Sequence, residues 1–297
     1  MRITIALAIA ATLQLGAAPP PKKLLTPNEI VAAAPAGAWR AISADDLLVL
    51  DLAGNRGRVV VQLAPAFAPV HVANIRALAR AGFWDGATVY RVQENYVVQW
   101  GNNDSEKPWP KGVTAKPPAE YTRPLKGLRI TPLGSPDPYA PAAGFADGWP
   151  VAYSPRAGWA SLAHCYASVG AGRDLSPDTG TGGELYAAIG HGPRQLDRVI
   201  AVVGRVVAGL EHMTILPRGT EALGFYKDKG QHVPIASIRL ASALPAAERP
   251  VFEFMDTNSA TFARYLKVRA NRRDDFYIRP AGGVDLCNVQ VPVRHRP

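Results

Sequence analysis

The stretch of sequence that decides the fold runs from Val89 to Gly101 and is VYRVQENYVVQWG. Two runs rich in aromatic and β-branched residues flank the short polar segment 93–95, a pattern that predicts a β-hairpin. Successive side chains of a strand point to opposite faces, and Arg91 and Gln99 are polar residues inside these otherwise apolar runs. A strand arginine is most often a surface charge, so the hairpin alone assigns no function to Arg91.

Apolar runs on both sides of the hairpin predict further short strands, and one amphipathic repeat predicts a helix. The helix is expected over 68–81, where Val72, Ile75 and Leu78 share one face and Pro69 lies in the first turn. A second, shorter helix is expected directly after the strand over 200–206. The strands expected outside the hairpin cover residues 47–52, 58–63, 160–165, 185–189, 200–206 and 234–240, and the short helix covers 208–213.

These motifs together resemble the cyclophilin family. Tyr90-Arg91-Val92 followed by Tyr96-Val97-x-Gln99-x-Gly101 has the spacing of the family motif F-H-R-V-x-x-x-F-M-x-Q-G-G. The segment Gly158-x-Ala160-Ser161-Leu162-Ala163-His164 is similar to G-x-L-S-M-A-N. Other similar segments follow in the family order, so the resemblance covers about residues 45–242; they are 58–63, 69–75, 183–186 and 196–206.

The resemblance implies a mainly β fold for residues 44–242, a closed eight-stranded antiparallel β-barrel capped by two helices. It also implies a peptidyl-prolyl cis-trans isomerase that binds proline-containing, unfolded or extended polypeptides. By the same resemblance, Arg91 and Gln99 are the catalytic pair. The substrate-binding residues are then Tyr96, Val97, Ala163, His164, Glu184, Tyr186, Leu196 and Ile200.

The chemistry of isomerisation suits these residue types. Rotation about an X–Pro bond faces a barrier of roughly 18–20 kcal/mol, because the nitrogen lone pair is delocalised into the carbonyl. A fixed guanidinium such as that of Arg91 can donate a hydrogen bond to the prolyl nitrogen as the bond twists. Gln99 would hold that guanidinium through its amide oxygen. Isomerisation needs no proton transfer, so His164 is expected to be a hydrogen-bonding residue of the groove rim rather than an acid or base.

The first 18 residues have the features of a secretory signal peptide. Arg2 precedes an apolar stretch from Ile3 to Leu15, and small residues follow at 16–18. An uncleaved N-terminal anchor is the alternative. No later segment is long enough to span a bilayer, so we expect a periplasmic or secreted protein with no integral membrane segment after signal removal. The Ala/Pro-rich residues 19–43 are expected to be a tether.

Two regions lie outside the motif pattern. Eleven of the 27 prolines fall between residues 102 and 160, so 102–159 is expected to be a long insertion, either a loop near the groove or a disordered decoration. Only 128–130 suggests a strand there. Residues 243–297 are expected to form a small α+β extension with a helix over 259–270. Its strands are expected at 251–254 and near Phe276 and Val289.

The chain has two cysteines, Cys165 and Cys287. Export to an oxidising compartment favours a disulfide between them, which would clamp the extension beside the barrel. Two separate buried thiols are the alternative. Two cysteines are too few for a disulfide-rich scaffold or a four-cysteine zinc module.

Composition narrows the remaining function classes. The chain has 33 Lys and Arg against 24 Asp and Glu, a net charge of +9, but the basic residues are scattered, so nucleic acid is not an expected partner. Hydrolase and metal-binding motifs are absent, so no metal or cofactor is expected. We expect a monomer. Two alternatives to the isomerase stay open: a catalytically weak binding module or chaperone for envelope proteins, and a structural envelope component.

Overall fold

The computed structural model describes residues 24–102, 107–274 and 276–296. The expected signal peptide at 1–18 and the first part of the expected tether, 19–23, lie outside the described residues. In the described part of the chain, no helix has the length and apolar character needed to cross a bilayer.

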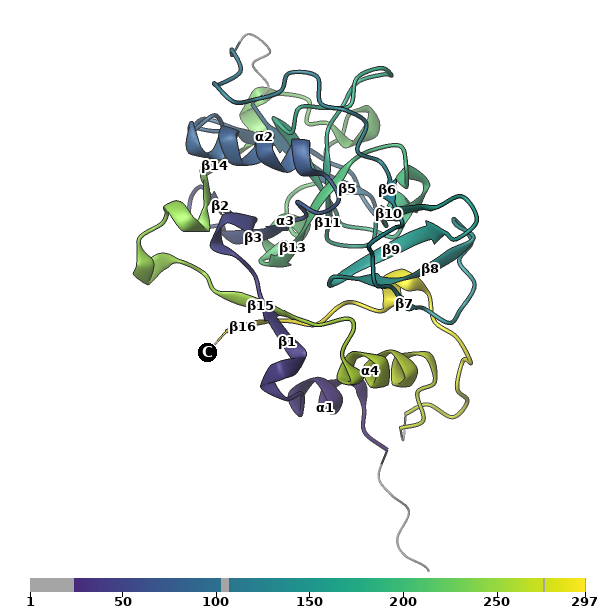
Figure 1. Cartoon of the computed structure of the whole chain (residues 1–297). Helices are drawn as coiled ribbons and strands as arrows, with labels where there is room; N and C mark the ends of the chain where they lie inside the picture. Colours follow the sequence, from purple (N-terminus) through teal and green to yellow (C-terminus); the bar gives the residue numbers. More distant parts are fainter. Residues whose placement is uncertain (1–23, 103–106, 275, 297) are drawn as a thin grey trace, which may run out of the picture.

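Eight antiparallel strands close into a barrel, in the order β11-β12-β5-β4-β14-β2-β3-β13 (Figure 1). The predicted hairpin forms two of them and pairs Arg91 with Gln99 in register. The closed barrel confirms the fold class predicted from the sequence. Its strands are β2 (Leu47–Leu52), β3 (Gly57–Leu63), β4 (Thr88–Val92), β5 (Val97–Gly101), β11 (Ser168–Ala171), β12 (Glu184–Ala188), β13 (Val202–Ala208) and β14 (Val233–Leu240).

Helices α2 (Pro69–Arg80) and α3 (Leu210–Thr214) cover the barrel. Val72, Ile75 and Leu78, the apolar face predicted for the first helix, are fully buried in the same core as the inward side chains of the strands. From α3, Leu210 and Met213 enter this core too. Apolar burial of this kind is the main stabilising contribution to such a fold, about 25 cal/mol per Å² removed from water.

From residue 123 onward the insertion contributes to a folded sheet, so this part is not the loop or disordered decoration expected from its prolines, whereas residues 107–122 contain no helix or strand. Its five short strands lie in the order β6-β10-β9-β8-β7 (Figure 1). Trp149, Val151 and Leu162 of this sheet pack against Phe67 and Val202 of the barrel region. Residues 128–130, where a strand was expected, are not in one. The strands are β6 (Arg123–Pro124), β7 (Thr131–Pro132), β8 (Ala142–Ala146), β9 (Trp149–Ser154) and β10 (Trp159–Leu162).

The sequence prediction therefore assigned the strand over 160–165 to the wrong sheet. Residues 159–162 form β10 of the insertion sheet, and the barrel strand at this point of the order is β11. The barrel strand β11 contains a closely packed glycine. Gly170 of β11 lies opposite Tyr186 of β12, and a Cβ at Gly170 would lie 2.3 Å from the Tyr186 hydroxyl oxygen. A side chain at position 170 would therefore displace the Tyr186 ring.

Residues from both ends of the chain build the remaining unit. The three-stranded sheet β1-β15-β16 carries α1 and α4 (Figure 1). The expectation of a tether over 19–43 is thus wrong for its described part, since α1 and β1 pack with α4 and β15 around Phe262 and Met255. The elements are α1 (Pro27–Ala32), β1 (Trp39–Ala41), β15 (Phe252–Met255), α4 (Ala260–Ala270) and β16 (Val293–His295).

The helix expected over 259–270 is observed with Ser259 as its N-cap, its hydroxyl accepting a hydrogen bond from the Phe262 backbone nitrogen. The strand expected at 251–254 is observed as β15. No strand lies at Phe276 or Val289, and the last strand is β16 instead. Short 3-10 helices connect the elements: Ala36–Ala38, Ala44–Asp46, Gly192–Leu196, Ala222–Gly224, Lys229–Gln231, Ala241–Ala243, Ala246–Glu248 and Leu286–Asn288.

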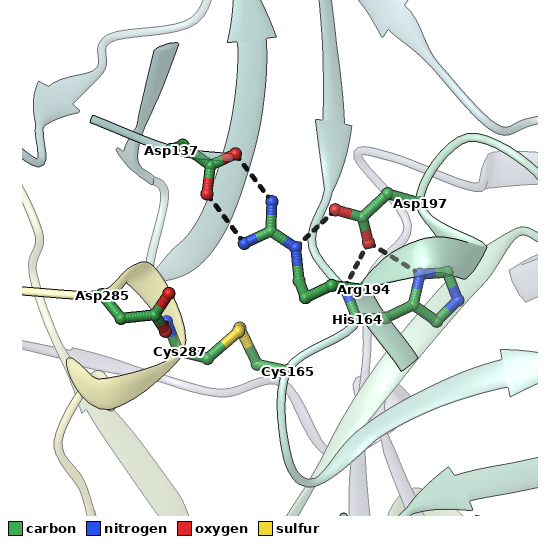
Figure 2. The surroundings of a disulfide bond; sticks show 7 residues. All are labelled: Asp137, His164, Cys165, Arg194, Asp197, Asp285 and Cys287. Atoms are coloured by element: carbon green, nitrogen blue, oxygen red, sulfur yellow. Dashed lines mark hydrogen bonds and ion pairs between the residues drawn. A yellow bond between two sulfur atoms is a disulfide. The ribbon is translucent and has the colours of Figure 1, made fainter. Parts of the chain in front are cut away.

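Cys165 and Cys287 form a disulfide in the structure, with their Cα atoms 5.0 Å apart and a sequence separation of 122 (Figure 2). The bond joins the segment after β10 to the C-terminal segment. Closing a chain loop of this size is worth about 4–5 kcal/mol in the chain-entropy account of disulfides.

Candidate active site

A groove of about 640 Å³ opens on the barrel beside β4, β5 and β12. It gathers eight of the ten residues that the sequence assigned to catalysis and substrate binding, namely Arg91, Tyr96, Val97, Gln99, Glu184, Tyr186, Leu196 and Ile200. Ala163 and His164 do not line it. This volume lies within the range of about 300–1,000 Å³ common for binding sites.

The Arg91 guanidinium is fixed by three neutral acceptors. Its Nη1 donates to the Gln99 amide oxygen at 3.0 Å, and Nη2 donates to the Gln93 amide oxygen at 2.5 Å. Nε donates to the Leu223 carbonyl at 2.7 Å. A guanidinium has five N–H groups, so one on each terminal nitrogen is left for a ligand.

Aromatic rings flank the same guanidinium. Its carbon lies 5.2 Å from the ring centroid of Phe225 and 5.8 Å from that of Tyr96. Burial lowers the pKa of Arg91 below its ordinary value. Arginine nevertheless stays protonated at neutral pH, so the groove holds a fixed positive charge in a partly desolvated place.

Gln99 connects Arg91 to a second polar group. While its oxygen accepts from Arg91, its Nε2 donates to the Tyr90 hydroxyl at 2.7 Å, and that hydroxyl donates to Glu184 at 2.7 Å. Burial, together with the Glu184 charge, raises the pKa of Tyr90, so the phenol keeps its proton. The amide of Gln99 is thereby locked in one orientation, with its oxygen toward Arg91.

The floor of the groove beside Arg91 is apolar. Val97 and Tyr186 are almost fully buried, and Leu196 and Ile200 complete the lining. A proline ring is a small apolar body, and a recess of such side chains removes it from water.

His164 supports this floor from behind and does not touch the groove, contrary to the sequence prediction of a rim residue. It is 1% exposed. Asp197 can only accept, so His164 Nδ1 donates to Asp197 Oδ1 at 3.0 Å (Figure 2). Nε2, the other nitrogen of the ring, forms a hydrogen bond with the Tyr186 hydroxyl at 2.9 Å. His164 is thus a positioning residue for Tyr186.

Ala163 is also misplaced by the sequence prediction. It is 2% exposed and belongs to the core of the unit built from the two chain ends. Gly172 lines the groove in place of Ala163, and its backbone amide donates to the Glu184 carbonyl at 2.8 Å. Both errors follow from the same misassigned strand.

Several groove residues were missed by sequence reasoning. Lys107 and Trp109 reach the groove from the insertion, where Trp109 stacks on Phe83 with ring centroids 5.2 Å apart. Leu223 and Phe225 come from the connection before β14 and hold Arg91. None of these residues belongs to a motif. The aromatic side chains of Trp109 and Phe225 are the one sequence signal that could have suggested a role in the groove. Among the described residues, no cluster of three or more His, Cys, Asp or Glu side chains is arranged to hold a metal ion.

The fold and groove agree with the comparisons to known proteins. The family model described as "Cyclophilin type peptidyl-prolyl cis-trans isomerase/CLD" matches residues 49–241, more than half of the chain. The chain therefore belongs to the cyclophilin-type peptidyl-prolyl cis-trans isomerases. No curated protein matches its sequence.

Among solved structures, the chain is similar to the cyclophilin AquaCyp293 from Hirschia baltica, with a TM-score of 0.68 and 23% identity over 92% of this chain and 98% of that one. This similarity extends the shared fold beyond the barrel. A cyclophilin-type isomerase from Cryptosporidium parvum, solved in the presence of the dipeptide Ala-Pro, aligns with a TM-score of 0.41 and 12% identity over 65% of this chain and 98% of that one.

Proposed function

We propose that this cyclophilin-type isomerase accelerates X–Pro rotation through Arg91. The observation that carries the proposal is a guanidinium held rigidly by Gln99, Gln93 and the Leu223 carbonyl beside an apolar recess. In this arrangement two N–H groups stay free. A proline ring seated on Val97 and Tyr186 would bring its nitrogen toward them.

The free N–H groups act where the transition state differs from the ground state. A planar amide nitrogen is a poor acceptor, because its lone pair is delocalised, whereas a twisted amide recovers that lone pair. A hydrogen bond from Arg91 therefore stabilises the twisted bond more than either planar isomer. Such differential stabilisation lowers the barrier and raises kcat.

Gln99 contributes by positioning. Its amide oxygen orients the Arg91 guanidinium, and Tyr90 and Glu184 orient the amide in turn. Because Gln99 is neutral, it fixes Arg91 without cancelling its charge.

We propose that the clients are exported proteins, in the periplasm or outside the cell. The signal-like sequence of residues 1–18 supports this placement, and so does a disulfide between the only two cysteines. Cell fractionation with an antibody to the protein tests it. Recovery in the cytoplasmic fraction with an intact N-terminus would refute the placement.

A proline-containing model peptide tests the catalytic proposal. Arg91→Lys keeps a positive charge but loses the fork of donors, so its kcat/KM should fall nearly as far as that of Arg91→Ala. Arg56→Ala, at an exposed hairpin position, is the matched control and should keep full activity. Full activity of Arg91→Lys would show that the charge suffices and would refute the hydrogen-bond role.

The alternative of a binding module for extended chains is favoured by one observation, the exposed Trp109 on the groove rim beside the half-buried Lys107. It predicts peptide binding that survives in Arg91→Ala with no measurable turnover in the wild type. The same assay, run with a titration of peptide binding, separates the two functions.

A further inference from the structure

A second cavity lies outside the isomerase groove and shares no lining residue with it. It has a volume of about 610 Å³ and lies between the outer face of β11 and β13, helices α1 and α4, and residues 287–293. Most of its surface is apolar, with contributions from Val31, Leu162, Val206, Val289 and Val291. Parts of the motif segments 158–164 and 196–206 line it, but the proposed isomerase activity makes no use of it.

One row of polar side chains crosses this otherwise apolar face of the barrel. Ser168 of β11 pairs in register with Arg205 of β13, and Arg205 pairs with Gln62 of β3. Directly paired residues of an antiparallel sheet point to the same side, about 5 Å apart. Ser168 and Arg205 line the cavity together.

The charge of Arg205 is not balanced by a carboxylate. Its Nε and Nη2 donate to the Gln62 amide oxygen at 3.0 and 2.8 Å, and Nη1 donates to the Gly148 carbonyl at 2.8 Å. No Asp or Glu among the described residues forms an ion pair with it. The Trp149 ring covers the guanidinium, with its centroid 4.7 Å from the guanidinium carbon.

Burial lowers the pKa of Arg205 to about 9, which still leaves the side chain charged at neutral pH. A partly buried cation of this kind is costly unless an anion pairs with it. Glu211 also lines the cavity, but its side chain is 72% exposed and lies 4.0 Å from His212. An exposed carboxylate of that kind remains solvated and does not replace a partner for Arg205.

The hydroxyl of the neighbouring Ser168 also lacks a partner among the described residues. Ser168 is 5% exposed, and its Oγ has no hydrogen-bond partner within the described parts of the chain. A buried hydroxyl left without a partner costs about 1–3 kcal/mol. Arg205 has two N–H groups left after its three hydrogen bonds, so the pair offers donors to one ligand group.

We propose that this cavity binds a small amphiphilic carboxylate, such as a medium-chain fatty acid. The carboxylate accepts hydrogen bonds from Arg205 and Ser168, and the aliphatic tail lies against the valines of residues 289–291 and β13. A carboxylate has two oxygens with several lone pairs, which suits a fork of donors beside a hydroxyl. The apolar remainder of the cavity excludes small hydrophilic anions as preferred ligands, because they would leave those walls unfilled.

Calorimetric titration with dodecanoate below its micelle concentration tests the proposal on the full mature chain. Dodecanoate should bind at one site per chain and raise the Tm, because a ligand that binds only the folded state stabilises it. Dodecanol has the same tail and no charge, so its affinity should be lower than that of dodecanoate by about tenfold or more. Arg205→Gln and Ser168→Ala should each weaken dodecanoate binding, the former by about tenfold or more.

Arg56→Gln, an exposed arginine on the β2 to β3 turn, is the matched control and should bind like the wild type. Unchanged turnover of a model peptide verifies that each variant is folded, since the groove shares no residue with the cavity. If Arg205→Gln does not fold, Ser168→Ala and the dodecanol comparison decide. Equal binding of dodecanoate and dodecanol, no binding of either, or full binding by Ser168→Ala and Arg205→Gln would overturn the proposal.

Discussion

Two arginines of the isomerase region, Arg91 and Arg194, are held in opposite ways. Arg194 is 3% exposed and is surrounded by carboxylates: Nη1 and Nη2 donate to Asp137 at 2.9 and 2.8 Å, and Nε donates to Asp197 at 2.6 Å (Figure 2). Arg91 has three contacts of similar length, but each acceptor is a neutral carbonyl oxygen.

The difference separates two uses of the same side chain. Carboxylates neutralise Arg194, which joins the insertion, through Asp137, to the segment that holds His164. Neutral acceptors fix the position of Arg91 and leave its charge available to a ligand. We infer that acceptor type, more than burial, distinguishes the functional guanidinium from the structural one.

The largest expected effect is on stability at Arg194. Arg194→Met leaves Asp137 and Asp197, which are 1% and 6% exposed, buried without their cation. Loss of one partner of a buried ion pair costs about 3–5 kcal/mol, so the free energy of unfolding should fall by that amount in urea denaturation. Arg91→Met is the control and should cost less than about 1 kcal/mol, because groove water can hydrogen-bond its freed acceptors. Similar losses in both variants would erase the distinction.

The next prediction gives Arg91 an acceptor of the Arg194 type. Gln93→Glu replaces the neutral oxygen at Nη2 by a carboxylate, so the charge of Arg91 is partly cancelled. We expect kcat/KM for a model peptide to fall by up to about tenfold, corresponding to about 1.4 kcal/mol of lost transition-state stabilisation. Gln93→Ala, which adds no charge, should lose less. Higher activity in Gln93→Glu than in Gln93→Ala would contradict the role given to the neutral acceptors.

A smaller effect is expected at His164 and Tyr186, where the surroundings of Arg194 meet the groove that contains Arg91. His164→Ala leaves the buried Tyr186 hydroxyl without its partner and loosens the floor of the proline recess. The Michaelis constant should rise by a few-fold, with a smaller change in kcat, because the floor binds the ring in all states. Tyr186→Phe removes the hydroxyl itself, so the effects on KM should not add in the double variant. Additive effects would mean that His164 acts elsewhere.

The smallest effect concerns Arg40 and Asp256, which join β1 to the residue after β15 with a 2.7 Å ion pair. Burial, the largest single influence, raises the pKa of Asp256, but the hydrogen bond and charge of Arg40 together with the hydrogen bonds from Asn258 outweigh it, and the pKa lies below its ordinary 3.8. A carboxyl group whose pKa is lower in the folded than in the unfolded protein stabilises the fold when the pH is above its unfolded-state pKa. This stabilisation is lost as the pH falls through the folded-state pKa. Arg40→Gln should therefore cost less than about 1 kcal/mol at pH 7 and nothing once the pH is low enough to protonate Asp256 in the folded protein. A cost that persists in acid would refute the link.

Much of the barrel and of the groove could be predicted from the sequence because their signals are local. The hairpin, α2 and the register of Arg91 opposite Gln99 follow from alternation, periodicity and motif spacing. The groove residues missed by motif reasoning, such as Phe225, lie in irregular connections that only tertiary packing places near Arg91.

The errors arise where contacts are distant in sequence. A three-residue strand such as β1 has no periodicity of its own and exists because it pairs with β15, more than 200 residues away. Ala163 and His164 were placed by a motif in which Ala163 matches and His164 stands where the family has Asn, but the barrel strand at this point is β11, where Gly170 pairs with Tyr186. Spacing within a segment does not contain that information.

The central claim is that Arg91 stabilises the twisted bond and that Gln99 acts only by holding Arg91. The most direct test is a cycle of four proteins, the wild type, Arg91→Ala, Gln99→Ala and the double variant, assayed for kcat/KM on one proline-containing peptide. We predict that Arg91→Ala loses about ten- to a hundredfold, that Gln99→Ala loses less, and that the double variant equals Arg91→Ala. Wild-type activity in Arg91→Ala, or losses that add in the double variant, would contradict the account.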